Sequence, residues 1–261
     1  MADFVPLRGL LLIDCHCHLL PGIDDGPQTL EESLAMARTL EGMGFAEVHC
    51  TPHCIHGLYE NSPAIVGERL AELQQVIRDE GLHLRLKPGM EYYLDSHFPA
   101  YLENPQLLGA SRLLLVEAPT WAEAEMVLDN LRRVVGGGYI PLLAHPERWS
   151  LLAAPGQGRG AGSLMARLLR GGKGSPSLEL LGELQRLGCL FQGNLGSFAG
   201  RYGKVVEKRA WAFLRAGLYS CVGSDSHPRP GLEEMLDTGL RRLHERSDRA
   251  DELLSASRLL S

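Results

Sequence analysis

The chain has 261 residues, 44% of them hydrophobic, which is enough to bury one large α/β core. Its formal net charge of -6 excludes a general attraction to nucleic acid or anionic lipid, so an anionic substrate must be attracted by a local excess of positive charge. We expect no membrane span, because no apolar run approaches roughly 20 residues, and no secretory signal at the N-terminus.

The six cysteines, at positions 15, 17, 50, 54, 189 and 221, have neither the spacing of a disulfide framework nor that of a paired C-x-x-C zinc site. A reducing cytoplasm is therefore the expected location. Cys50 and Cys54 with His53 leave a thiolate zinc site open as an alternative, but small buried side chains are the favoured interpretation of these cysteines.

The apolar run 10–13 predicts a buried strand that continues into the sequence D-C-H-C-H. Alternate side chains of a strand share a face, so His16 and His18 should point the same way. Imidazole pairs suit zinc, iron or manganese, and the loop that contains Asp25 could add oxygen ligands. Two histidines that only make hydrogen bonds remain the alternative for this pair.

Most of the later predicted strands also end in a potential metal ligand. Taken singly, each such residue has an ordinary interpretation as a solvated glutamate or a structural histidine. In a barrel of parallel strands, however, catalytic groups collect at the carboxyl ends. The strands and the residues after them are 45–51 with His53, 83–87 with Glu91, 113–116 with Glu117, 139–144 with His145, and 219–223 with Asp225 and His227; a further strand is expected at 189–192.

Helices are expected between these strands. Thr29 and Glu32 have the form of a capping box, so the first helix should begin there and end at Gly42 and Gly44. Further helices are expected at 68–80, from Pro119 to about 135, at 178–187, at 205–216 and as a terminal pair from about 233.

Residues 153–177 interrupt the pattern because they are rich in glycine and proline and contain several arginines. We interpret them as an exposed, mobile insertion rather than a domain boundary, with a basic partner-binding loop as the alternative.

The series D-x-H-x-H, T-P-H, E, E, H-P-E-R and S-D-x-H resembles the PHP (polymerase and histidinol phosphatase) superfamily. That resemblance implies an α/β fold, a distorted (β/α)7 TIM-like barrel with a multinuclear metal site. More narrowly, H-C-H-L-L-P-G-I-D-D-G, M-E-Y-Y-L-D, Q-G-N-L-G-S-F-A-G-R-Y-G and G-S-D-S-H are similar to the manganese-dependent bacterial tyrosine phosphatases of capsule and exopolysaccharide clusters, the CpsB/CapC group. The match covers about 12–235 outside the insertion and implies one PHP-type domain over 1–261.

The resemblance also implies a ligand set for three metal ions. Manganese is expected, with iron or zinc possible, because histidines and carboxylates without a thiolate do not suit a closed structural zinc site. Three divalent ions would outweigh the four ligand carboxylates and so attract a phosphate dianion. The expected ligands are His16, His18, Glu91 and Asp225 for one metal, Glu91, Glu117 and His145 for a second, and Asp25, His53 and His227 for a third.

The implied reaction is hydrolysis of a phosphomonoester by a hydroxide generated at the metals, so no cysteine or serine nucleophile is required. Arg148 of H-P-E-R is expected to bind the phosphate, with a salt bridge to a nearby glutamate as the alternative. The family's second phosphate-binding arginine lies some residues after the S-D-x-H histidine. Here Arg229 follows His227 by only two positions, in a shorter loop.

The implied substrate is phosphotyrosine on the tail of a bacterial tyrosine kinase that controls polysaccharide export. Aromatic rings at the rim should then contact the phenol ring, unless they belong to the core. The remaining alternatives are a histidinol phosphatase or another small-molecule PHP phosphoesterase, and a metal-binding interaction module without activity. The candidate rim residues are Tyr92, Tyr93, Phe198 and Tyr202.

Overall fold

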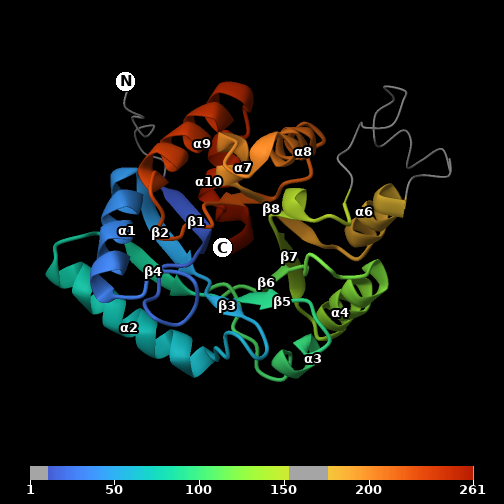
Figure 1. The fold of residues 1–261 in the computed structure, drawn as a ribbon, viewed down its shortest axis with the longest axis horizontal. Helices are drawn as coiled ribbons and strands as arrows, with labels where there is room; N and C mark the ends of the chain where they lie inside the picture. Colours follow the sequence, from blue (N-terminus) through green and yellow to red (C-terminus); the bar gives the residue numbers. More distant parts are fainter. Residues whose placement is uncertain (1–10, 153–175, 261) are drawn as a thin grey trace.

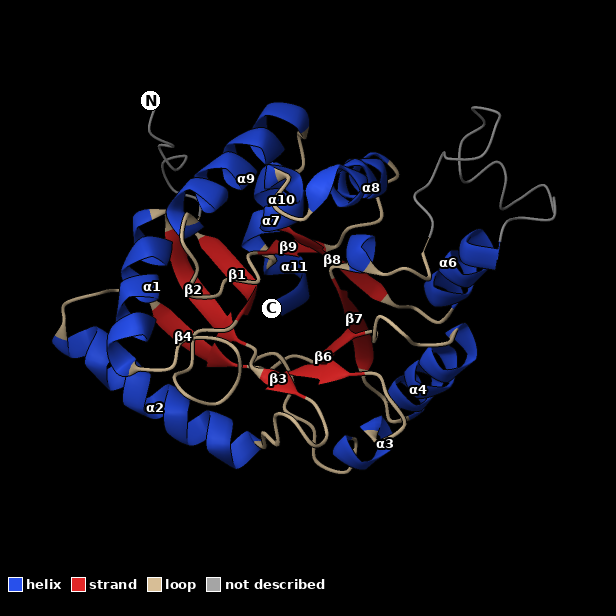
Figure 2. Ribbon diagram, viewed as in Figure 1, coloured by secondary structure: helices blue, strands red, loops and turns tan. Residues whose placement is uncertain are grey.

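The computed structural model describes residues 11–152 and 176–260, and the predicted insertion at 153–177 lies almost entirely outside them. Parallel strands form a ring with helices around its outside (Figure 1, Figure 2). The strands are β1 (Leu12–Cys17), β2 (Phe45–Cys50), β3 (His53–Cys54), β4 (Arg85–Pro88), β5 (Glu91–Tyr93), β6 (Leu113–Glu117), β7 (Ile140–Ala144), β8 (Leu190–Asn194) and β9 (Cys221–Gly223).

The ladders run in the order β1-β2-β4 in one sheet and β3-β5-β6-β7-β8-β9 in the other, and every pair is parallel. A parallel bridge from Cys17 to Ser226 joins the end of β1 to the segment after β9. Because β3 directly follows β2 and β5 directly follows β4, each pair forms one interrupted strand. The described residues therefore occupy seven barrel positions, which confirms the expected distorted (β/α)7 fold.

Both interruptions have a local cause. Pro52 separates β2 from β3 and has no N–H for the ladder, although its carbonyl still accepts from Glu91 N at 3.0 Å. Gly89 separates β4 from β5 where the backbone approaches its neighbours closely. A Cβ at position 89 would lie 2.7 Å from Leu108 Cδ2 and 2.8 Å from Thr51 Cγ2. The breaks set His53 and Glu91 opposite each other in the β3–β5 pair.

Helices follow most strands and pack their apolar faces against the ring. None of the described helices combines the length and apolar character needed to cross a membrane. The helices are α1 (Leu30–Gly42), α2 (Pro63–Asp79), α3 (Phe98–Tyr101), α4 (Ala124–Gly136), the 3-10 helix η1 (Pro146–Arg148), α6 (Pro176–Arg186), α7 (Leu195–Ala199), α8 (Gly203–Arg215), α9 (Leu232–Arg246), α10 (Ala250–Ser255) and α11 (Ser257–Leu260).

The first helix begins as its capping residues predict. Thr29 has an extended backbone, and its hydroxyl accepts from Glu32 N at 3.2 Å. The Glu32 carboxylate, however, accepts from Gln28 N at 2.6 Å rather than from Thr29 N. Only one of the two reciprocal hydrogen bonds of a capping box is therefore present, the one from Glu32 N to the Thr29 hydroxyl.

The helices differ from these expectations in four places. The helix expected at 68–80 begins earlier, at Pro63, because the Ser62 hydroxyl caps it by accepting from Ile65 N at 3.4 Å. The fourth helix was expected from Pro119 but begins at Ala124, because residues 119–122 form a separate turn in which Ala122 N donates to Pro119 O. The glycine-rich stretch after β8 contains the short helix α7, capped by the Asn194 side chain. The terminal pair is a set of three helices, because Ser247 and Ala256 interrupt the helical backbone.

A small apolar cluster fills the inside of the ring at the end where the strands begin. It includes Cys15, Leu113, Leu142 and Cys221, and Ala256 of the C-terminal segment packs against them. The polar side chains therefore gather at the opposite end, where the strands finish.

Candidate metal centre

The nine residues expected as metal ligands come together at the carboxyl ends of the strands. Four overlapping groups among them each offer ligand atoms that lie within 4.8 Å of one another. The groups are His18, Asp25, His53 and His227; His16, Glu91 and His145; His16, His18 and Asp225; and His53, Glu91 and Glu117.

The centre of the cluster is formed around His16, near the end of β1, and His18, which directly follows the strand. Nε2 of His16 and Nε2 of His18 lie 3.2 Å apart, so both rings point to one place, as the alternation of the strand predicts. Oε2 of Glu91 lies 3.2 Å from the first nitrogen and 3.4 Å from the second. Oδ1 of Asp225 lies 3.5 and 3.4 Å from the same two atoms. Four ligand-type atoms therefore converge within hydrogen-bond range.

Further ligand-type atoms lie around this centre. On one side, Nε2 of His145 lies 3.1 Å from Oε1 of Glu91 and 3.8 Å from Oε1 of Glu117. On the other, Oδ1 of Asp25 lies 3.1 Å from Nε2 of His227 and 3.6 Å from Nε2 of His53. Glu91 therefore lies close both to His16 at the centre and to His145.

Burial decreases from the centre outward. The exposed fraction of the side chain is 1% for Glu91, 17% for Glu117 and 43% for Asp25. The group that contains Asp25 therefore faces the solvent side of an open cavity. The residues that line this cavity are Asp25, His53, Glu117, His145, Arg148, Tyr202, Asp225, His227 and Arg229.

The donor set fits a metal better than it fits a protein-only hydrogen-bond network. Oε2 of Glu91 and Nδ1 of His53 are both buried and lack a hydrogen-bond partner, although they lie 3.1 Å apart. Buried polar atoms are rarely left in this condition. Carboxylate oxygens and imidazole nitrogens that share one point are the arrangement that a divalent cation satisfies.

The pKa values of the clustered side chains also favour a metal ion at this site. Burial lowers the pKa of His16, but the carboxylates of Glu91 and Asp225 outweigh burial and raise this pKa to about 9. Burial and the negative charge of Glu91 raise the pKa of Glu117 to about 7. The clustered carboxylates therefore make the site electrostatically favourable for cations, and metal ions would supply that positive charge.

Two of the expected ligands have a left-handed backbone. The φ angle is 32° at His145 and 50° at Asp225. Residues other than glycine seldom adopt this conformation, which costs roughly 1–3 kcal/mol and is concentrated at functional sites. Hydrogen bonds hold both: His145 N donates to Gln192 Oε1 at 3.1 Å, and Asp225 N donates to His16 O at 2.7 Å.

Arg148 lies against the cavity with one of its donors already engaged. Nη1 donates to Oδ2 of Asp225 at 2.7 Å, so the guanidinium pairs with an expected metal ligand rather than with a neighbouring glutamate. Its carbon Cζ lies 4.7 Å from the centre of the Tyr202 ring. The remaining nitrogens of the guanidinium are available to an anion in the cavity.

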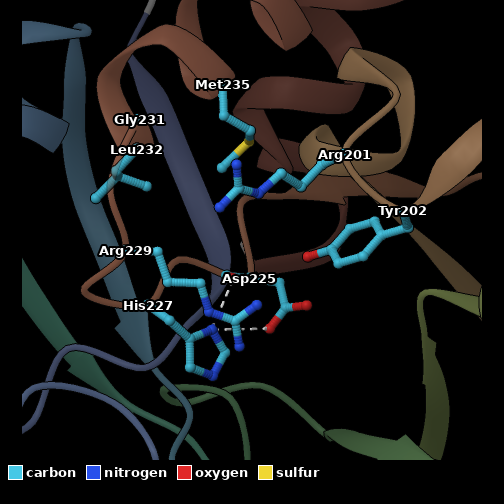
Figure 3. Close-up of a pocket in the computed structure, with 8 residues that line it drawn as sticks. All are labelled: Arg201, Tyr202, Asp225, His227, Arg229, Gly231, Leu232 and Met235. Carbon is cyan, nitrogen blue, oxygen red and sulfur yellow. Dashed lines mark hydrogen bonds and ion pairs between the residues drawn. The ribbon is translucent and has the colours of Figure 1, made fainter.

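Arg229 also lines the cavity, although only two positions separate it from His227. Its side chain is exposed, and Figure 3 shows its guanidinium beside Asp225 and His227. The shorter loop thus still places an arginine at the edge of the ligand cluster.

Sequence reasoning missed several residues that hold the expected ligands in place. Oδ2 of Asp24 lies 2.7 Å from Nδ1 of His18 and accepts from His53 N at 3.0 Å. Oε1 of Gln192 lies 3.1 Å from Nδ1 of His16. Nδ2 of Asn194 donates to Oδ2 of Asp225 at 2.8 Å. The position of Gln192 and Asn194 at the end of a strand was the signal that could have identified them.

The cysteines and two of the rim aromatics belong to the core. All six cysteines are buried and free, and no metal-type group in the described residues contains a thiol. Tyr92 and Phe198 are 1% and 0% exposed, so they cannot contact a substrate. Of the four aromatic residues expected at the rim, Tyr202 is the one that lines the cavity.

Comparison with known proteins connects this site to one family. The family described as "Capsular polysaccharide synthesis, CpsB/CapC" matches residues 12–158. Tyrosine-protein phosphatase YwqE of Bacillus subtilis is 32% identical over 221 residues, which cover 83% of this chain and 77% of that protein.

Solved structures agree with the sequence comparison. A chain from the structures of YwqE of Bacillus subtilis and CpsB of Streptococcus pneumoniae, described as unique metal-dependent tyrosine phosphatases, matches with a TM-score of 0.77 and 29% identity over 95% of this chain and 94% of that chain. The phosphotriesterase homology protein from Escherichia coli matches with a TM-score of 0.53 and 12% identity, over 99% of this chain and 100% of that chain. At this identity the match shows a common fold alone.

Proposed function

The chain belongs to the CpsB/CapC family, and from that membership together with its site we propose that it is a metal-dependent protein-tyrosine phosphatase. The observation that carries the proposal is that Glu91 and Asp225 both lie within 3.5 Å of His16 and His18, beside a cavity that Arg148 also lines. A phosphoryl group needs both a positive centre and directed donors, and this cavity offers places for both.

The metal site we propose uses the nine residues that come together. His16, His18, Glu91 and Asp225 would hold one ion, Glu117 and His145 would hold a second with Glu91, and the remaining ligands, Asp25, His53 and His227, would hold a third. Manganese is the proposed metal, because histidine and carboxylate ligands without a thiolate suit manganese or iron. When bound, the ions would supply Lewis-acid chemistry by polarising phosphoryl oxygens and acidifying water.

The side chains around the metals would orient the phosphoryl group. Arg148 is fixed by its ion pair with Asp225 and by the ring of Tyr202, so its remaining donors point at the cavity without a large loss of conformational freedom. As negative charge shifts onto the phosphoryl and leaving oxygens, these donors would bind more strongly than they do in the ground state. Arg229 would add a second positive charge at the edge of the same cavity.

Phosphotyrosine on an extended protein segment is the proposed substrate, and the tail of a bacterial tyrosine kinase in capsule or exopolysaccharide control is the proposed partner. The family description and the names of the relatives support this choice. The solvent-facing Asp25 and the partly buried Tyr202 leave the cavity open at the rim, where an extended chain could lie. The six free cysteines support a cytoplasmic location, where thiols remain reduced.

The test is a phosphatase panel on metal-stripped protein to which manganese, iron, zinc or magnesium is restored separately. Matched phosphotyrosyl and phosphoseryl peptides and histidinol phosphate would be compared by kcat/KM. We expect activity to return with manganese, and phosphotyrosyl peptides to be the best substrates, partly because a phenoxide is the better leaving group. A kcat/KM for histidinol phosphate or a phosphoseryl peptide equal to that for phosphotyrosine would contradict the proposal.

A further inference from the structure

A second pocket lies directly beside the metal cavity. It is open to solvent and shares Tyr202, Asp225, His227 and Arg229 with that cavity. Arg201, from the turn between α7 and α8, lines the second pocket but not the first. A group bound here would therefore be adjacent to a phosphoryl group at the metals without replacing it.

Two guanidinium groups reach into this pocket from different segments. Figure 3 shows the Arg201 guanidinium near Met235 and the Arg229 guanidinium beside Asp225 and His227, at different parts of the pocket wall. Both side chains are exposed. Among the described residues, neither arginine pairs with a carboxylate, and the polar contact of the Arg201 guanidinium is from Nη2 to Pro230 O at 3.4 Å. Arg148, by contrast, is paired with Asp225.

The rest of the pocket favours an anionic group on an apolar stem. Leu232 and Met235 form an apolar wall, and the pocket also meets the N-terminal end of α9 at Gly231. The partial positive charge of that end adds to the two arginines, although Glu233 and Glu234 in its first turn offset part of it. In a protein with a net charge of -6, two arginines that pair with no carboxylate in the described part of the chain provide local positive charge beside the metal cavity.

We propose that the pocket between Arg201 and Arg229 is a subsite for a second anionic side chain of the substrate, close to the phosphotyrosine in the same peptide. This inference rests on the proposed phosphatase function and adds a sequence preference to it. Arginine binds carboxylates and phosphoryl groups through two parallel hydrogen bonds, so aspartate, glutamate or a second phosphotyrosine shares the required chemistry. The apolar wall would contact the stem or ring of that side chain.

The test compares phosphotyrosyl peptides that differ at one flanking position. Each position on either side of the phosphotyrosine would carry aspartate, asparagine, lysine or a second phosphotyrosine in turn. For the wild-type protein, we expect an anionic residue at one or more positions to raise kcat/KM by roughly 10-fold over asparagine, and this preference to decrease at high salt. The comparison of the aspartate peptide with the peptide that carries a second phosphotyrosine shows whether the subsite prefers a carboxylate or a phosphoryl group.

The variant Arg201→Met tests the assignment, because Arg201 lies outside the metal cavity. It should bring the anionic peptides to the level of the asparagine peptides and leave kcat/KM for p-nitrophenyl phosphate within about 2-fold of wild type. Arg201→Lys should restore part of the preference. The matched control is Arg241→Met, which should change neither quantity. Arg241 is an exposed arginine of α9 that does not line the pocket and pairs with Glu245 at 3.2 Å.

The outcomes separate this inference from the function on which it rests. No hydrolysis of any phosphotyrosyl peptide would overturn the proposed function. Hydrolysis that is insensitive to the flanking charge would overturn the subsite alone. An equal loss for p-nitrophenyl phosphate and all peptides in Arg201→Met, or a weaker inhibition by inorganic phosphate in that variant, would place Arg201 in the phosphoryl site instead and would also overturn the subsite.

Discussion

Oδ2 of Asp24 lies 2.7 Å from Nδ1 of His18, while the other ring nitrogen of His18 faces Glu91 and Asp225. The carboxylate thereby fixes which nitrogen carries the proton and leaves Nε2 with its lone pair directed at the cluster. Asp24 also accepts from Gly26 N at 2.9 Å, so one buried carboxylate holds both the histidine and the loop that carries Asp25.

Asp24→Ala should therefore weaken metal binding although Asp24 is not an expected ligand. A partner of this kind typically accounts for 10–100-fold in metal affinity, and we expect a loss in that range. Metal titration of the stripped protein measures it, with the exposed Asp129→Ala on α4 as the control. An unchanged metal affinity would mean that contacts other than the one with Asp24 are sufficient to orient His18.

Arg148→Ala should lower kcat/KM by roughly 100-fold or more, because the loss of one transition-state donor costs about 3 kcal/mol. The metal content should not change, since Asn194 also holds the Asp225 carboxylate. Arg209→Ala, which removes a nearby guanidinium that donates to Trp149 O at 3.3 Å, is the control. Metal loss in the Arg148 variant would instead indicate that Arg148 serves mainly to hold Asp225.

The chemistry should not depend on a thiol. Burial raises the pKa of Cys54 and of Cys189 to about 12, so at pH 8 only on the order of one thiol in 10,000 at these positions is a reactive thiolate. Iodoacetamide should leave the native protein unmodified by mass and fully active, whereas chelation of the metals should abolish activity. Inactivation by a single alkylation of folded, metal-loaded protein would refute this expectation.

Glu147→Ala should lower the free energy of unfolding by about 2–4 kcal/mol, because it leaves buried donors without an acceptor. The Glu147 side chain is completely buried and accepts from Asn194 N at 3.0 Å and from the Tyr219 hydroxyl at 2.9 Å. Urea unfolding measures the change, and Glu72→Ala on the surface of α2 is the control. A loss below 1 kcal/mol would show that water replaces both contacts.

The sequence predicted which polar residues come together better than it predicted the bounds of the elements around them. The alternation that begins in β1 placed His16 and His18 on one face, and Glu117 ends an apolar strand, so local patterns were sufficient for these residues. Asp24 could not be distinguished from Asp25 in this way, because the choice between them depends on how the loop folds back to His18.

The break between β2 and β3 and the break between β4 and β5 could not be predicted from the local sequence either. Pro52 and Gly89 look like ordinary loop residues, and only the pairing of β3 with β5 shows that each strand resumes after its break. Tyr92 and Phe198 likewise carry no local sign that separates a rim position from a core position. Their burial depends on neighbours that are distant in the sequence, such as Trp211, whose ring centre lies 4.8 Å from that of Phe198.

The outward decrease in burial across the ligand groups has a consequence for the rate of metal exchange. Asp25 is 43% exposed, whereas Glu91 is almost completely buried, so water and chelators reach the group of Asp25, His53 and His227 first. We expect ions to leave the protein in at least two kinetic phases, with the fast phase assigned to that group. Stopped-flow chelation would then show Asp25→Asn accelerating the fast phase alone, and the three sites would differ in lifetime although they share neighbouring ligands.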